Sequence, residues 1–344
     1  MRFGLFGGAR IGKANPLGDS QGYRDFIEYV KCAEQLGFHS VFLVEHHFTG
    51  HGQLSASLNL LSYLAACTSR MRLGTAVVVL PWHNPALLAE QVATLDVLSG
   101  GRVDFGVGRG YRKNEYEAFC IPMEEGWERF NECMEFLLEA WRSPGRFSHH
   151  GKRWHYHDIV VEPPPVQKPH PPIWMAAGSP DSIARVAAGD YNLLLDQLGS
   201  IDQTIDRLEL YLDGLEKIGR PRDAGRVGVT RGLTIVRTEA ERRTAYERRR
   251  ETLKNIGELA RPPVGAQPQS YADVDIASDD AALIGTPEEI VERLNRLAAG
   301  GVEYVLLTNA SATPESLALF AERIMPHVSG AKATPARTPA VAGS

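Results

Sequence analysis

Residues 37–48 read Gly-Phe-His-Ser-Val-Phe-Leu-Val-Glu-His-His-Phe. The apolar run Ser40–Val44 predicts a short buried strand. It ends in three adjacent titratable side chains, Glu45, His46 and His47. Such a cluster directly after a strand is not typical of a core, so this strand end is a candidate site.

The same pattern of a short apolar run followed by a helical period recurs along the chain. Candidate strands cover Arg2–Phe6, Ser40–Val44, Arg72–Leu80, Val103–Val107, Ile173–Ala176, Asn192–Leu195, Val227–Val236 and Tyr304–Leu307. The helical stretches after them cover Tyr23–Gln35, Ser57–Thr68, Pro85–Leu98, Gly126–Trp141, Pro180–Ala188, Ile201–Ile218, Glu239–Glu258 and Pro314–His327. A ninth helix, Pro287–Ala299, begins after the capping residue Thr286. Alternating strands and helices predict an α/β fold, and eight units favour a closed TIM (β/α)8 barrel over an open doubly wound sheet.

Two stretches interrupt this alternation. Residues 146–172 are rich in His, Pro and aromatic side chains and indicate a hairpin-like insertion. The segment 259–284 is too long for a structureless connector, and we expect it to form a mobile lid over the face of the barrel where active sites lie. The sequence therefore predicts a single barrel domain over 1–328, with 329–344 as a disordered tail.

Composition narrows the class of protein. The 344 residues include 37 basic and 42 acidic side chains, a formal net charge of −5, and 43% are hydrophobic. A mildly acidic chain of mixed sign is a poor nucleic-acid binder, and no apolar run approaches the ~18 residues of a membrane span. Four scattered cysteines and the lack of a signal-peptide pattern indicate a cytoplasmic protein with reduced thiols. The histidines at 149, 150, 155 and 157 lie in the insertion, and we expect no metal site there.

Barrel enzymes place their chemistry at the carboxyl ends of the strands. At the second strand end, His46 or His47 would act as an acid or base, and Glu45 would hold the imidazole in one tautomer. The alternative is a strand cap with surface histidines.

A second candidate site follows the fourth and fifth strands. Arg109 stands between Gly108 and Gly110, which allow a close backbone approach to a ligand, and its planar fork suits a phosphate. Ser179 and Ser182 would add hydroxyls at a helix N-terminus. The alternative is a salt-bridged arginine and an ordinary helix cap.

Several blocks together resemble one family, the bacterial luciferase-like flavin monooxygenases, close to the luciferase α-subunit type. The blocks are residues 37–48, 73–81 (Leu-Gly-Thr-Ala-Val-Val-Val-Leu-Pro), 96–110 (from Asp-Val-Leu-Ser-Gly-Gly-Arg to Gly110) and 165–173 (Pro-Val-Gln-Lys-Pro-His-Pro-Pro-Ile). They occur in the family's order, and the resemblance spans about residues 1–328.

The resemblance implies a two-component enzyme that binds reduced FMN and uses O2, through a C4a-(hydro)peroxyflavin, to oxygenate a small organic substrate. It implies a separate NAD(P)H:flavin reductase and a homodimer. By position, His46 matches the catalytic histidine, flanked by Glu45 and His47. The flavin-binding positions are Arg109, Gly110, Gly178, Ser179 and Ser182, with a non-proline cis peptide at Ala76–Val77.

This sequence departs from the luciferase pattern at three positions. Gly108 stands in place of a reactive cysteine, Gly178 in place of an acidic residue, and Asp196 in place of an aromatic residue of light-emitting relatives. These changes argue against aldehyde oxidation with light emission, and Asp196 becomes a weak candidate for a substrate contact. A deazaflavin-dependent oxidoreductase of the same superfamily and a non-catalytic flavin-binding subunit remain alternatives.

Overall fold

Eight parallel strands form a closed ring in the part of the chain that the structure describes, residues 1–9, 21–50, 53–259, 281–308 and 313–330. In this computed structural model the ring runs through β1 (Arg2–Gly7), β2 (Ser40–Leu43), β3 (Arg72–Thr75), β5 (Val103–Gly108), β8 (Ile173–Ala176), β9 (Asn192–Leu195), β10 (Val227–Ile235) and β12 (Tyr304–Thr308). β12 pairs with β1, and β10 pairs with both β9 and β12, so the sheet closes on itself. The predicted TIM barrel is confirmed.

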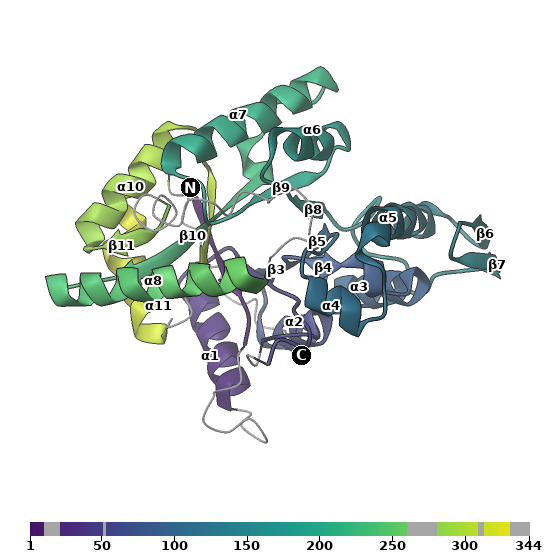
Figure 1. Cartoon of the computed structure of the whole chain (residues 1–344), viewed down its shortest axis with the longest axis horizontal. Helices are drawn as coiled ribbons and strands as arrows, with labels where there is room; N and C mark the ends of the chain where they lie inside the picture. Colours follow the sequence, from purple (N-terminus) through teal and green to yellow (C-terminus); the bar gives the residue numbers. More distant parts are fainter. Residues whose placement is uncertain (10–20, 51–52, 260–280, 309–312, 331–344) are drawn as a thin grey trace, which may run out of the picture.

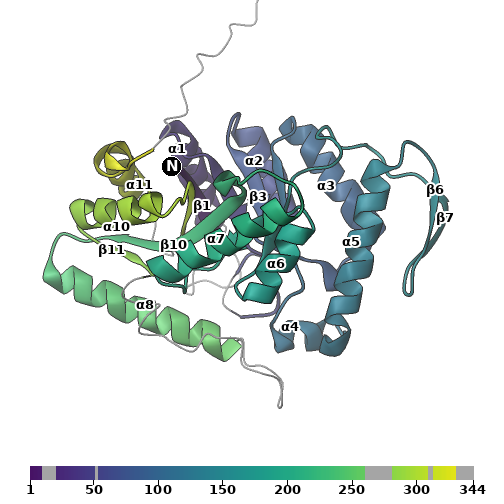
Figure 2. The same cartoon turned by 90° about the horizontal axis from the view of Figure 1, so that it is seen from above.

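Helices surround this ring in both views of the molecule (Figures 1 and 2). They are α1 (Gln21–Gln35), α2 (Ser57–Cys67), α3 (Pro85–Ser99), α4 (Lys113–Ala118), α5 (Gly126–Arg142), α6 (Pro180–Ala188), α7 (Ile201–Lys217), α8 (Glu239–Leu259), α10 (Pro287–Ala299) and α11 (Pro314–Arg323). Thr286 caps its helix as predicted, and Asn84 and Ser179 likewise accept backbone N–H bonds at a helix start. No helix in the described ranges is long and apolar enough to cross a bilayer.

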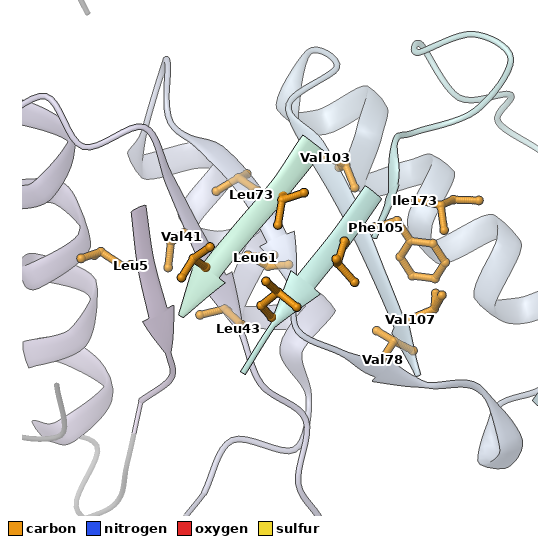
Figure 3. Packing of buried hydrophobic residues seen from close by; sticks show 14 of the residues in the cluster. Leu5, Val41, Leu43, Leu61, Leu73, Val78, Val103, Phe105, Val107 and Ile173 are labelled. Carbon is orange, nitrogen blue, oxygen red and sulfur yellow. The ribbon is translucent and has the colours of Figure 1, made fainter. Parts of the chain in front are cut away.

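Side chains alternate along each strand between two cores. One set, including Leu5, Val41 and Phe105, packs under the helices in the large hydrophobic cluster (Figure 3). The other set, including Phe42 and Trp174, fills the inside of the barrel. Burial on both faces explains why these strands are almost continuously apolar.

Glycines inside the barrel make room for its few large rings. A Cβ added to Gly74 would lie 2.4 Å from the ring of Phe42, and one added to Gly106 would lie 1.7 Å from the backbone oxygen of Thr75. The Thr75 hydroxyl also bonds the Gly106 backbone, donating to its oxygen at 2.7 Å and accepting from its nitrogen at 2.8 Å. The strands therefore approach closely at these positions.

The strand predicted over Arg72–Leu80 is in fact two strands. β3 ends at Thr75, and β4 (Val78–Val79) pairs with the end of β5. Between them the Ala76–Val77 peptide bond is cis, as the resemblance implied. The predicted helix Pro314–His327 also ends early, since α11 stops at Arg323 and a 3-10 turn covers Met325–His327.

The predicted insertion over 146–172 contains an antiparallel hairpin of β6 (Phe147–His150) and β7 (His155–Ile159), which projects beyond α5 at the right of Figure 2. The lid predicted over 259–284 lies, for residues 260–280, outside the described residues. The prediction is wrong for the last lid residues, 283 and 284, because they belong to the strand β11 (Leu283–Gly285), which pairs with β10. The predicted tail lies outside the described residues from position 331 onward.

Gly106→Ala should destabilise the fold strongly, because the new methyl group meets a backbone atom that cannot rotate away. Overpacking of this kind costs about 1–3 kcal/mol or more. Gly145→Ala is the matched control, since a Cβ there meets nothing within 4 Å. Urea unfolding of both variants checks this, and equal stability would contradict the close approach of β3 and β5.

Candidate active site at the carboxyl ends of the strands

Glu45 is the centre of a hydrogen-bond network just beyond β2. It is 3% exposed, and its Oε1 lies 2.9 Å from Nε2 of both His47 and His83 and 3.0 Å from Nε1 of Trp82. Burial alone would raise the pKa of Glu45, but the hydrogen bonds from His47 and His83 outweigh it and lower the pKa to about 2. Glu45 is therefore a carboxylate that only accepts hydrogen bonds.

His46 is held by a different carboxylate. Its Nδ1 lies 3.3 Å from Oε1 of Glu115, a buried residue of α4, and the same oxygen accepts the backbone N–H of His47 at 2.9 Å. The sequence left open which of the two histidines Glu45 would hold: in the structure Glu45 bonds His47, and Glu115 bonds His46. A proton on Nδ1 leaves Nε2 of His46 as the acceptor.

Burial lowers the pKa of His46, and the hydrogen bond to Glu115 partly offsets that effect. The imidazole is therefore mainly neutral at pH 7, the form that can take up a proton.

An aromatic wall adjoins these histidines. Trp82 stacks on Phe119 with 5.2 Å between ring centroids, and the edge of His47 meets Phe119 at 4.9 Å. Phe48 contacts the same ring but is 64% exposed. The wall gives the strand ends an apolar surface next to a polar network, a combination common in small-molecule sites.

Arg109 meets a second arginine over one indole ring. Its guanidinium lies 5.0 Å from the ring centre of Trp127, and that of Arg185 lies 5.5 Å from the same centre. Neither arginine forms an ion pair with a carboxylate of the described residues. Two cations without a counter-charge therefore lie together at the ends of β5 and α6.

Ser179 and Ser182 form the capping box of α6 in the same region. The Ser179 hydroxyl lies 2.9 Å from that of Ser182; Ser179 is exposed and Ser182 is half-buried. Gly178 precedes them, and a Cβ there would lie 3.1 Å from Oδ2 of Asp196. The helix N-terminus and its hydroxyls thus remain open to solvent.

Two glycines of the candidate site, Gly108 and Gly110, lie at or just after the end of β5. A Cβ on Gly108 would lie 2.4 Å from Cγ2 of Val77, so the end of β5 touches the Ala76–Val77 bond. Gly110 has a φ of +80° and passes under Trp82, whose ring would lie 2.9 Å from an added Cβ. Both glycines are thus required by close contacts at the same strand end.

Asp196 was predicted as a weak substrate contact, but its carboxylate already accepts hydrogen bonds from nearby residues of the chain. Its Oδ1 accepts the backbone N–H of Leu198 at 2.7 Å, and its Oδ2 lies 3.4 Å from Nη1 of Arg207. These contacts shape the loop after β9.

Sequence reasoning missed Glu115, His83, Trp82, Trp127 and Arg185. Arg185 had a readable signal, because it lies three residues after Ser182 and shares its helix face. Glu115 had no readable signal, because it lies 69 positions away from its partner His46 in the sequence. Only the closed barrel brings those two loops together.

Glu115→Gln should lower the pKa of His46 further, because a nearby carboxylate favours the charged imidazolium. NMR titration of the His46 ring protons measures this. Glu117→Gln on the exposed face of α4 is the control and should leave the value unchanged. A pKa that stays constant or rises in Glu115→Gln would show that the carboxylate does not act on His46.

Comparisons with known proteins all indicate the same family. The family model described as luciferase-like monooxygenase matches residues 1–304. The flavin-dependent trigonelline monooxygenase, oxygenase component, of Acinetobacter baylyi is 31% identical over 189 residues, or 54% of this chain and 52% of that protein. The FMNH2-dependent dimethylsulfone monooxygenase of Pseudomonas putida is 26% identical over 318 residues, which is 87% of this chain and 86% of that protein. The chain spans about half the length of two of the curated relatives it matches, 52% in each case.

Solved structures agree in fold. The monooxygenase RslO1 from Streptomyces bottropensis has a TM-score of 0.82 and 26% identity, covering 95% of this chain and 99% of that one. FMN-binding and F420-binding structures below 25% identity share the fold equally, so the fold alone does not select the cofactor. On the match over residues 1–304, the chain belongs to the luciferase-like monooxygenase family.

Proposed function

We propose that this chain is the oxygenase component of a two-component, FMN-dependent monooxygenase. It would receive reduced FMN from a separate NAD(P)H:flavin reductase and oxygenate a small organic substrate with O2. The observation that carries the proposal is the pair Arg109 and Arg185 on Trp127, without a carboxylate partner among the described residues, with Arg185 on the same short helix, α6, whose N-terminus carries Ser179 and Ser182.

A phosphate monoester fits this arrangement. Two guanidinium groups would neutralise its charge through short, charge-assisted hydrogen bonds. The N–H groups at the start of α6 and the hydroxyls of Ser179 and Ser182 supply further donors. FMN carries such a phosphate, whereas riboflavin does not, so these residues would distinguish the two.

FMN in its reduced form supplies the electrons that activate O2. The residues of this chain would do the rest. Val77 and Gly108 form a smooth contact surface at the strand ends, and the aromatic wall excludes water. His46, neutral and with Nε2 free of Glu115, would hold or move a proton during oxygenation. Glu45 and His47 would fix the loop that carries it.

The relatives' names favour FMN and a reductase. One relative is named FMNH2-dependent, and another is named as an oxygenase component. The free cysteines of the chain suit a reducing compartment, and we place the protein in the cytoplasm.

We also propose a homodimer. α2 and α3 pack together and carry several exposed large hydrophobic side chains, Tyr63, Leu87, Val97 and Leu98. An apolar face of this kind is typical of an interaction surface. Sedimentation velocity would report the oligomeric state.

Arg109→Ala should weaken FMN binding by roughly tenfold to a hundredfold and spare riboflavin, because a hydrogen bond to a charged group contributes about 1.5–3 kcal/mol. Fluorescence titration with both flavins measures this. Arg146→Ala, on the exposed hairpin, is the control and should bind both normally. Equal loss for FMN and riboflavin would remove Arg109 from the phosphate site.

The purified chain should not oxidise NADH or NADPH with FMN and O2 above background. Adding a flavin reductase and a substrate panel that includes dimethylsulfone and trigonelline should give oxygenated product. His46→Ala should lower product formation by ~10²-fold, as expected for a lost acid–base group, with FMN affinity unchanged. His150→Ala, on the exposed hairpin, is the matched control.

Two outcomes would contradict the proposal. Steady, FMN-dependent consumption of NAD(P)H by the chain alone would indicate a self-sufficient oxidoreductase. Turnover with a reduced deazaflavin but not with reduced FMN would favour the deazaflavin-dependent alternative.

A further inference from the structure

A cavity of about 210 Å³ opens at the opposite end of the barrel, where the strands begin. Each residue on its lining belongs to a strand start or to the turn just before one. They are Arg2, His39, Arg72, Asp104, Gln167, Pro172, Trp174, Asn192, Gly225, Arg226 and Tyr304. The site proposed for flavin lies at the other strand ends, so an occupant here cannot be the flavin or its substrate. The cavity is many times larger than the roughly 10–15 Å³ that one water needs.

Cations outnumber carboxylates on this lining. Arg72 binds Asp104 through two bonds of 2.6 and 2.7 Å, and Arg226 binds Asp190, just outside the lining, at 2.7 Å. Arg2 has no carboxylate partner among the described residues: one of its nitrogens donates to the Gly225 backbone oxygen, and its guanidinium lies over the ring of Tyr304. Three guanidinium groups thus face two carboxylates.

Hydrogen-bond donors are also in excess. Among the described residues, Nε and Nη1 of Arg2 and Nη1 of Arg72 have no acceptor. The amide acceptors of the lining are already used, since Oε1 of Gln167 and Oδ1 of Asn192 accept from arginines. The free nitrogens of Arg2 and Arg72 can therefore bind an acceptor that enters the cavity from outside.

His39 adds no charge. Burial first, and then the Arg2 charge, lower the pKa of His39 to about 4, so the imidazole is neutral at pH 7. The excess charge therefore comes from Arg2.

We propose that this cavity binds a small oxyanion, such as inorganic phosphate or a short carboxylate, held chiefly by Arg2 and Arg72. The anion supplies the missing negative charge and the missing acceptors together. It also links β1 to β3 across the barrel opening, so its binding stabilises the closed ring by mass action.

The test uses sulfate as the probe, on the full chain without flavin, with sodium chloride keeping the ionic strength constant. Titration calorimetry is carried out on Arg109→Ala, in which the phosphate site proposed at the opposite end is weakened, so that a second change at Arg2 shows how much of the remaining sulfate binding belongs to this cavity. We expect saturable binding of sulfate. Adding Arg2→Gln should weaken it by about tenfold or more, the effect of losing one charge-assisted bond.

Two further measurements keep the proposal testable if Arg2→Gln fails to fold. Arg72→Lys retains the positive charge and removes the free Nη1 donor, and should weaken sulfate severalfold. In the unmodified chain, sulfate should shift the NMR signal of the His39 ring at concentrations matching the calorimetric saturation. The same assay with phosphate and with succinate shows whether the cavity prefers an inorganic anion or a short carboxylate.

The proposal is overturned if Arg109→Ala binds no sulfate saturably. It is also overturned if sulfate binding survives both Arg2→Gln and Arg72→Lys unchanged, because the anion would then occupy another site.

Discussion

Pairing of β1 with β12 is the interaction on which the rest of the structure depends. It joins residues about 300 positions apart, with Arg2 opposite Tyr304 and Phe6 opposite Thr308. Without it the sheet would have two open edges, and each edge would expose a row of unpaired backbone groups. Closing the ring also sets the direction of every strand. All carboxyl ends then point to one mouth, and all amino ends point to the other.

Closure imposes a packing constraint inside the ring. The interior of an eight-stranded barrel is just wide enough for side chains to fill it. Here a few large residues, Phe42, Trp174 and Tyr304, occupy that space. Their neighbours are correspondingly glycines, as at Gly74 and Gly106. The interior is therefore a packed core that separates the two mouths.

The two mouths differ in chemistry because different side chains end up there. At the carboxyl mouth, Glu45 and Glu115 hold His47 and His46 beside an aromatic wall. At the amino mouth, arginines from strand starts surround a small cavity. Both are loop and strand-end features on a rigid frame, and barrel enzymes place their chemistry at the carboxyl mouth.

The sequence by itself determined the repeating unit. Apolar runs followed by helical periods gave eight strands and the helices around them, because burial on both sheet faces leaves a continuous apolar signal. Local signals also placed the caps of α3, α6 and α10, since a cap acts within three residues. The short strands β4 and β11 and the helix α4 escaped prediction, being too short for a period to show.

Only the tertiary structure decided which side chains meet. The sequence placed Glu45 next to His46, yet neighbours along a strand end point in different directions. Glu45 therefore reaches His47 and His83, while Glu115 reaches His46 from α4. The pairing of Arg109 with Arg185 over Trp127 likewise joins three segments that are far apart in the chain. Long-range contacts of this kind follow from the order of the strands in the sheet, where β2, β3, β5 and β8 are neighbours, and no local pattern in the sequence encodes them.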